Sequence, residues 1–342
     1  MPGRGGPRRR GSGPVIHESV VSCIGRTPIV ALRRLFAEPG VEVLAKLEML
    51  NPGGSVKDRP ARHIIEEGLR DGTLTPDSHL VESTSGNFGI ALAMVCRIHD
   101  LPLTVVVDPN ITPTNLQLLR RYGAHVDMVT EGGGSGGYLE QRLRRVREIV
   151  GAVPGSVWIN QYANRLNWQA HAETTGKEIL ADVDGPLDCV VMAVSTTGTI
   201  HGVARALRAA HPRLRVVAVD AVGSVIFGHP PAPRRVPGIG AGRVPELLCR
   251  DEIDDVVLVD DDQAVQGCHE LLRSEGILAG GSSGSVVAGL WQLLPRLPRP
   301  VRVMTLLPDR GERYLDLLYA DAPAEPALDW PPLSPRRPLS RS

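Results

Sequence analysis

The chain has 342 residues, of which 42% are hydrophobic, so it is long and apolar enough to bury a sizeable core in about two domains. It has 38 basic and 38 acidic residues and therefore a formal net charge of zero. The chain lacks the excess of basic residues that is typical of nucleic-acid-binding proteins. No apolar run reaches the length that spans a bilayer, so we expect neither a nucleic acid nor a membrane as a partner.

Runs of branched apolar residues alternate with helical patterns, which predicts parallel strands covered by helices and therefore an α/β fold. The Gly-rich stretch 131–138 is predicted to be a loop. The expected strands are 41–50, 102–108, 125–130, 156–160, 187–195, 214–221, 254–260 and 301–309. The expected helices are 57–71, 86–98, 113–122, 138–150, 165–182, 199–210, 262–274 and 283–294.

The two ends of the chain differ in composition from the rest. Residues 1–14 are rich in Gly, Pro and Arg without the apolar segment of a secretory signal, which predicts a disordered leader, and 321–342 reads as a disordered tail. The cysteines are scattered and show no CxxC spacing, which favours a reducing cytoplasm and no metal site. They are Cys23, Cys96, Cys189, Cys249 and Cys268.

Lysine is scarce in this Arg-rich chain, and only Lys46, Lys57 and Lys177 occur. Lys57 lies in "NPGGSVKDRPA" (51–61), behind a Gly-Gly-Ser turn and at the start of an expected helix. A lysine amine can lose its proton and attack a carbonyl, whereas arginine stays charged and forms no imine. Because most lysines are solvated surface cations, Lys57 indicates chemistry only together with other parts of a site.

Small polar residues fill three strand-to-helix junctions, namely 82–92, 193–203 and 278–289. Such a turn is more often a helix cap than a ligand site, so each junction alone is weak evidence for ligand binding. The run Ser195-Thr196-Thr197-Gly198-Thr199 is the best candidate for a phosphate, because its amides and hydroxyls converge at a helix start. GIGAG (238–242) does not follow a strand, which argues against a dinucleotide site, and Asp309 is expected to be a strand-end turn residue.

An imine-forming lysine, a phosphate cradle and a second anion loop together fit pyridoxal phosphate. NPGGSVKDR, ESTSGNFGIAL, INQYAN, TTGKEI, STTGTIHGV, GIGAG, LAGGSSGS and LPDRGERYL follow in the order and spacing of the cysteine synthase family of pyridoxal-phosphate enzymes, which the chain resembles over 15–320. The resemblance implies the tryptophan synthase β-like fold (type II), with two lobes that each hold a mostly parallel sheet. It also implies a large lobe of 15–50 and 160–320, a small mobile lobe of 51–159, and a homodimer.

The resemblance also implies roles for individual residues. Lys57 would hold the cofactor and act in catalysis, Asn87 would hydrogen-bond the 3-oxygen of its ring, and Ser282 would face the ring nitrogen. A serine cannot firmly protonate that nitrogen, which favours α,β-elimination over transamination. Thr196, Thr197, Gly198 and Thr199, with Ser195, would hold the phosphate. Thr84, Ser85, Gly86 and Gln161 would bind the substrate carboxylate.

The implied reaction is β-replacement on small amino-acid substrates. The chain departs from the cysteine synthase pattern at Phe88, Tyr162 and Ser195. Two of these changes add hydroxyls, which sulfide does not need, so they favour a larger, charged acceptor. We expect O-phospho-L-serine as donor and L-glutamate as acceptor, and the resemblance implies a step toward 2,3-diaminopropionate for a siderophore or peptide. Arg142 and Arg243 are candidate carboxylate or phosphate ligands, although either could be an ordinary solvated cation.

Two alternatives stay open at this point. The first is a cysteine synthase that uses O-acetylserine or O-phosphoserine with sulfide, in which the exchanges at Tyr162 and Ser195 are neutral. The second is a regulatory protein that binds pyridoxal phosphate without turnover, and the presence of both Lys57 and Asn87 argues against it.

Overall fold

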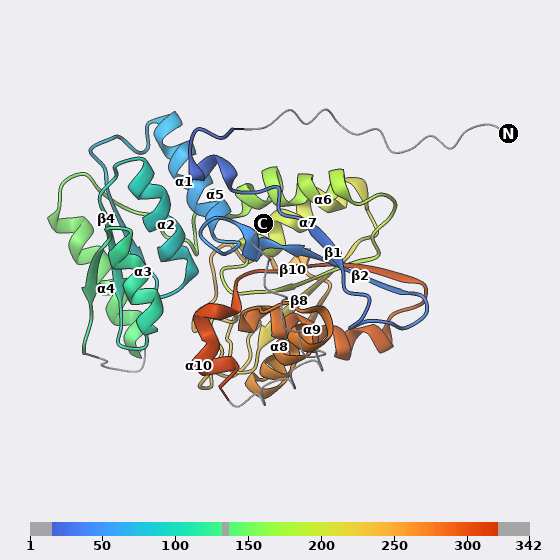
Figure 1. The fold of residues 1–342 in the computed structure, drawn as a ribbon. Helices are drawn as coiled ribbons and strands as arrows, with labels where there is room; N and C mark the ends of the chain where they lie inside the picture. Colours follow the sequence, from blue (N-terminus) through green and yellow to red (C-terminus); the bar gives the residue numbers. More distant parts are fainter. Residues whose placement is uncertain (1–15, 132–136, 321–342) are drawn as a thin grey trace, which may run out of the picture.

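The computed structural model describes residues 16–131 and 137–320, which form two sheets flanked by helices (Figure 1). The larger sheet has the strand order β1-β2-β10-β7-β8-β9, and every neighbouring pair is parallel except β1 with β2. Val303 pairs with Val43 on one side and Cys189 on the other, so distant parts of the chain meet at the centre. The strands are β1 (Ile29–Ala31), β2 (Val41–Leu47), β7 (Cys189–Ala193), β8 (Arg215–Ala221), β9 (Asp255–Val259) and β10 (Val301–Leu307).

Helices cover both faces of the larger sheet because its strands are apolar on both sides. On β8, Val217 and Val219 pack with α8 and α9, whereas Val216 and Ala218 pack with α7. Figure 1 shows α6 and α7 on one side of this sheet and α8 and α9 on the other. These helices are α6 (Lys177–Asp182), α7 (Gly198–Ala210), α8 (Asp261–Glu275) and α9 (Gly281–Leu293).

The smaller sheet is wholly parallel, with the order β5-β4-β3-β6. Val81 and Val106 pack against Val146 of α4, while the opposite face packs on α1, α2 and α3. The strands are β3 (His79–Ser83), β4 (Leu103–Val107), β5 (His125–Met128) and β6 (Ser156–Trp158). The helices are α1 (Asp58–Asp71), α2 (Asn87–Ile98), α3 (Pro113–Arg121) and α4 (Gly137–Ala152).

The prediction of one continuous α-helix at 165–182 was wrong. That segment is divided into α5 (Leu166–Ala170), a π-helical turn (His171–Gly176) and α6. This region packs tightly on α7, because a Cβ at Gly202 would lie 2.1 Å from the carbonyl oxygen of Trp168. Short helical turns complete the described chain: η1 (Val20–Cys23), η2 (Glu48–Leu50), η4 (Arg250–Glu252), η5 (Leu294–Arg296), η6 (Gly311–Tyr314) and α10 (Leu315–Leu318).

The predicted lobe boundaries at 50/51 and 159/160 fall between the strands of the two sheets, and the division into lobes stays a prediction. The predicted leader (1–14) and tail (321–342) lie outside the described residues. The predicted loop at 131–138 lies mostly outside them, and its last two residues begin α4. None of the helices in the described part of the chain is both long and apolar enough to cross a membrane.

Candidate active site

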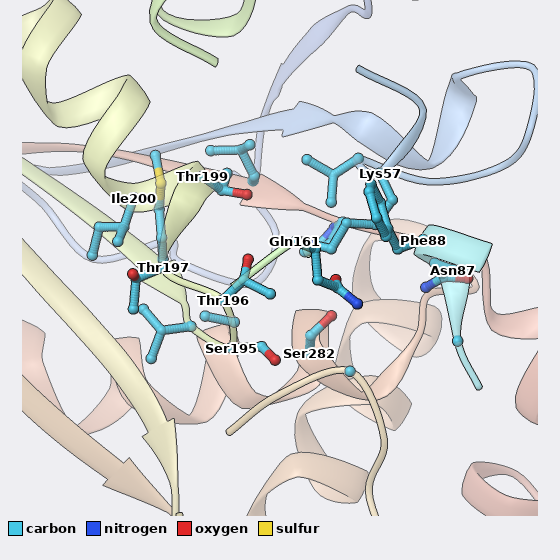
Figure 2. Close-up of a pocket in the computed structure, with 18 of the residues that line it drawn as sticks. Lys57, Asn87, Phe88, Gln161, Ser195, Thr196, Thr197, Thr199, Ile200 and Ser282 are labelled. Atoms are coloured by element: carbon cyan, nitrogen blue, oxygen red, sulfur yellow. The ribbon is translucent and has the colours of Figure 1, made fainter. Parts of the chain in front are cut away.

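A cavity lies between the two sheets, beyond the carboxyl ends of strands from both, as expected for α/β folds. Figure 2 shows the side chains of Thr196, Gln161 and Ser282 turned toward the same space. Most residues predicted from the sequence line this cavity: Lys57, Thr84, Gly86, Asn87, Gln161, Tyr162, Ser195, Thr196, Thr197, Thr199 and Ser282.

Lys57 directly precedes α1 and follows a turn that is fastened to the end of β10. The amide of Val56 donates to the carbonyl oxygen of Pro308 at 2.7 Å, and the amide of Gly53 donates to the Asp58 carboxylate at 2.5 Å. A Cβ at Gly53 would lie 2.5 Å from that carboxylate, so the turn requires glycine. The Gly-Gly-Ser turn therefore fixes the start of α1 and delivers Lys57 to the cavity.

The amine of Lys57 has the electrostatic setting that imine chemistry needs. Burial lowers its pKa from 10.5 to about 8, against an opposing effect of the nearby Asp309 carboxylate. Of the three lysines, only Lys57 lines the cavity, because Lys46 is buried in an ion pair with Glu178 and Lys177 is exposed. Lys57 is thus the candidate nucleophile and base.

We expect the rate at which pyridoxal phosphate attaches covalently to the apoprotein to rise with pH around a midpoint near 8. The neutral amine is the reactive form, and it accumulates as the pH rises through the lowered pKa. Stopped-flow absorbance between about pH 6 and 10 measures this rate. A midpoint near 10.5, the ordinary value for lysine, would contradict the assigned environment.

The phosphate-loop candidates surround the N-terminus of α7. Thr197 has a positive φ of 64°, and its buried hydroxyl has no hydrogen-bond partner in the described structure. A Cβ at Gly198 would lie 2.4 Å from the amide oxygen of Asn167, whose nitrogen donates to the Thr196 hydroxyl at 3.2 Å. An unpaired hydroxyl, free helix amides and a cradle that excludes a side chain fit a phosphate group.

Ser282 lies in the first turn of α9, is 4% exposed and lines the same cavity. Its hydroxyl can donate or accept one hydrogen bond without carrying charge, which suits a neutral ring nitrogen. Together, the lysine, the phosphate cradle and this serine fit the aldehyde, the phosphate and the ring nitrogen of pyridoxal phosphate.

Asn87 begins α2 and reaches a polar cluster on the segment that follows β10. Its amide nitrogen donates to Asp309 at 2.6 Å and lies 3.4 Å from the hydroxyl of Tyr314. Its amide oxygen accepts from Arg313. The expected bond from Asn87 to the cofactor stays a prediction, since protein groups engage both ends of the amide here.

Asp309 is the main residue that the sequence interpretation missed. The carboxylate is 2% exposed, accepts from the hydroxyl of Tyr314 at 2.7 Å, and influences Lys57 electrostatically. Burial raises the pKa of Asp309, although hydrogen bonds from Tyr314 and Asn87 partly oppose that effect. Its position at the carboxyl end of the central strand β10 could have revealed it, because that edge of a parallel sheet carries ligand sites.

Glu82, at the end of β3, is a second buried carboxylate that the sequence interpretation left unassigned. Burial raises its pKa to about 7, while hydrogen bonds from the amides of Ser83 and Gln161 act in the opposite direction. The bond from the Gln161 amide is 3.2 Å long and ties the segment after β6 to the end of β3. Glu82 therefore positions Gln161 at the cavity wall.

Tyr162 and Ser195, the two added hydroxyls, both lie in the cavity wall. Burial raises the pKa of Tyr162, although Ser195 acts to lower it, and the raised pKa keeps the phenol protonated and able to donate. The guanidinium of Arg243 stacks over the Tyr162 ring at 4.8 Å and pairs with Glu246. Arg243 is not among the residues that line this cavity, so its contact with substrate stays a prediction.

Ser85 and Arg142 line an adjoining cavity that shares Thr84, Gln161 and Tyr162 with the first. Arg142 donates to the Ser85 hydroxyl at 3.2 Å and pairs with Asp108 at 3.1 Å. The predicted carboxylate-binding residues thus lie where the two cavities join.

Comparison with known proteins identifies the class that this fold and site define. Residues 20–309 match the family described as pyridoxal-phosphate dependent enzymes, and the chain belongs to that family. The predictions that the protein is an enzyme, that it depends on pyridoxal phosphate and that it has the type II fold are therefore confirmed.

Two curated relatives resemble the chain over most of its length. It is 60% identical over 307 residues to the N-(2-amino-2-carboxyethyl)-L-glutamate synthase of Ralstonia nicotianae, covering 90% of this chain and 91% of that protein. It is 57% identical over 311 residues to the enzyme of the same name from Cupriavidus metallidurans, with the same coverage of 90% and 91%. Among solved structures, O-ureido-L-serine synthase matches with a TM-score of 0.83 and 36% identity, covering 91% of this chain and 98% of that chain.

Proposed function

We propose that the protein catalyses β-replacement, converting O-phospho-L-serine and L-glutamate to N-(2-amino-2-carboxyethyl)-L-glutamate and phosphate. The observation that carries this proposal is the identity of 60% and 57% to two enzymes named for that product. The hydroxyls of Tyr162 and Ser195 in the cavity wall support it, because a charged acceptor needs polar partners that sulfide does not.

Pyridoxal phosphate, when bound, withdraws electrons from the Cα atom of the amino acid and so makes its proton acidic. We assign the transfer of this proton to Lys57. With a pKa of about 8, about a tenth of its amine is neutral at pH 7 and can accept a proton. The Cβ–O bond to phosphate breaks, the glutamate amine forms a Cβ–N bond and loses a proton, and Lys57 returns its proton to Cα.

The remaining residues bind and orient. Thr196, Thr197, Gly198 and Thr199 suit the phosphate of the cofactor, and Ser282 suits its ring nitrogen. The loop of Thr84, Ser85 and Gly86 lines the junction of the two cavities together with Gln161, which suits the carboxylate of the donor amino acid. Closure of this loop over the donor would exclude water.

Replacement of Tyr162 by Phe together with Ser195 by Gly should raise the KM for glutamate by about 10²- to 10⁴-fold, since each of the two lost hydrogen bonds to a charged group is worth roughly 1.5–3 kcal/mol. Phosphate release from O-phosphoserine alone should change little. Steady-state kinetics with both substrates measure the two effects. If the double variant used glutamate as well as the parent, the two hydroxyls would have no part in acceptor binding.

We also propose that the protein is a homodimer located in a reducing cytoplasm and that its product leads to 2,3-diaminopropionate in a siderophore or peptide pathway. The dimer rests on the family resemblance, and a monomer in analytical ultracentrifugation would contradict it. The five cysteines are all free thiols, which supports a reducing compartment.

A further inference from the structure

The adjoining cavity shares part of its wall with the candidate active site and has the more polar walls of the two. One wall comes from the loops after β3 and β4 and from the first turns of α4. The other wall is the segment 232–240, which contains most of the GIGAG motif. Because Thr84, Gln161 and Tyr162 line both cavities, a molecule in the adjoining cavity can reach one bound beside Lys57.

Three arginines line the adjoining cavity, and two of them already have carboxylate partners. Arg142 pairs with Asp108 at 3.1 Å, and Arg235 pairs with Asp262 at 2.6 Å. Arg234 differs, because no ion pair joins it to any acid within residues 16–131 and 137–320. Its positive charge is therefore the one most available to a ligand carboxylate.

The GIGAG motif holds Arg234 in place. One guanidinium nitrogen of Arg234 donates to the carbonyl oxygen of Ile239 at 3.0 Å. A Cβ at Gly240 would lie 2.2 Å from that nitrogen and would displace the guanidinium, and the φ of +71° at Gly240 also favours glycine. This single bond leaves other donors of the planar guanidinium free for a bidentate contact.

Arg234 acts electrostatically on the buried Asp220. Burial raises the pKa of Asp220, and hydrogen bonds from Ser224 and Ala221, followed by the charge of Arg234, oppose that effect. One oxygen of the Asp220 carboxyl has no hydrogen-bond partner in the described structure. Arg234 is thus attracted to Asp220 without being paired to it.

Unpaired buried atoms also indicate that the adjoining cavity takes a polar ligand. The amide oxygen of Asn115 and the hydroxyl of Ser83 are buried, line the cavity and have no partner in the described residues. Asn115 is 4% exposed, and its amide nitrogen donates to the carbonyl oxygen of Ser85 at 3.0 Å, which directs the other end away from that loop. An acceptor atom and a cation in one cavity match an amino acid with an additional carboxylate.

We propose that the adjoining cavity binds the acceptor amino acid and that Arg234 binds its side-chain carboxylate. This proposal rests on the proposed function, because it assigns the acceptor of that reaction to a place. Arg234 thereby distinguishes a dicarboxylic acceptor from amino acids of similar size that lack the second charge.

The test compares Arg234→Gln and Arg234→Lys with the parent holoenzyme. Arg234→Gln should raise the KM for glutamate by about 10- to 100-fold and remove the preference for glutamate over glutamine. Titration calorimetry with glutamate, without donor, should show the same loss of affinity. Arg234→Lys keeps the charge and should restore much of the preference, while Arg215→Gln, which removes an arginine remote from the cavity and paired with Asp255, should leave it unchanged.

The donor reaction separates this inference from the proposed function. Arg234→Gln should release phosphate from O-phosphoserine as the parent does. An unchanged KM for glutamate would overturn the inference. An equal loss of rate in the donor reaction would also overturn it, because Arg234 would then only support the segment 232–240. If the parent itself made no product from glutamate, the proposed function would fail instead.

Discussion

Replacement of Lys57 by alanine should abolish turnover. Removing a group that transfers the Cα proton costs about 10²- to 10⁴-fold in rate, and loss of the covalent attachment adds to this. Lys57 directly precedes α1 and lines the cavity, and alanine leaves the turn contacts of Val56 and Gly53 intact. The variant should therefore fold.

The measurement is borohydride reduction of the purified protein followed by peptide mass spectrometry. In the parent, the reduced cofactor should be found attached to Lys57. In Lys57→Ala the cofactor should bind without a covalent bond and should be removable by dialysis. A label on Lys46 or Lys177 in the parent would contradict the assignment. External amines that partly restored proton transfer in the variant would further support the role of the lysine.

Replacement of Arg59 by alanine should lower the free energy of unfolding by about 3–5 kcal/mol, because it leaves a buried carboxylate without its partner. The guanidinium of Arg59 pairs with Glu48 at 2.6 Å and with Glu178 at 2.6 Å, and the side chains of Arg59 and Glu48 are 1% and 0% exposed. Glu178 also pairs with Lys46 at 2.9 Å. This network fastens α1, and with it Lys57, to the larger sheet.

Urea unfolding followed by circular dichroism measures this effect. Arg62→Ala is a matched control on the same helix, because its pair with Glu66 is partly exposed and worth about 0–1 kcal/mol. A similar change in the two variants would show that the buried network contributes no more than a surface pair.

Much of the fold could be predicted from the sequence because its strands are buried on both faces. The five consecutive buried residues of β4 are Leu103, Thr104 and three valines, a mostly apolar run that lacks the alternation of a half-exposed strand. β1 was not predicted, since three partly buried residues at the sheet edge carry no such pattern. The π-helical turn at 171–176 was missed as well, because it depends on close packing against α7 rather than on local residues.

The site was predictable where the chain itself brings the groups together. Lys57 follows a turn that demands glycine, and Thr196 to Thr199 share one helix start, so local sequence is enough. Asp309 and Arg234 were missed, because their importance depends on contacts with distant segments. An Arg-rich chain also hides which cation borders a cavity: Arg234 lines the second cavity, whereas Arg243 lies behind the ring of Tyr162.

The most direct test of the proposed reaction is one incubation of the purified protein with O-phospho-L-serine and L-glutamate labelled with nitrogen-15, read by mass spectrometry. We expect a product with the mass of N-(2-amino-2-carboxyethyl)-L-glutamate that retains the label, with one phosphate released for each product molecule. A product without the label, or preferential formation of cysteine when sulfide competes with glutamate, would contradict the account.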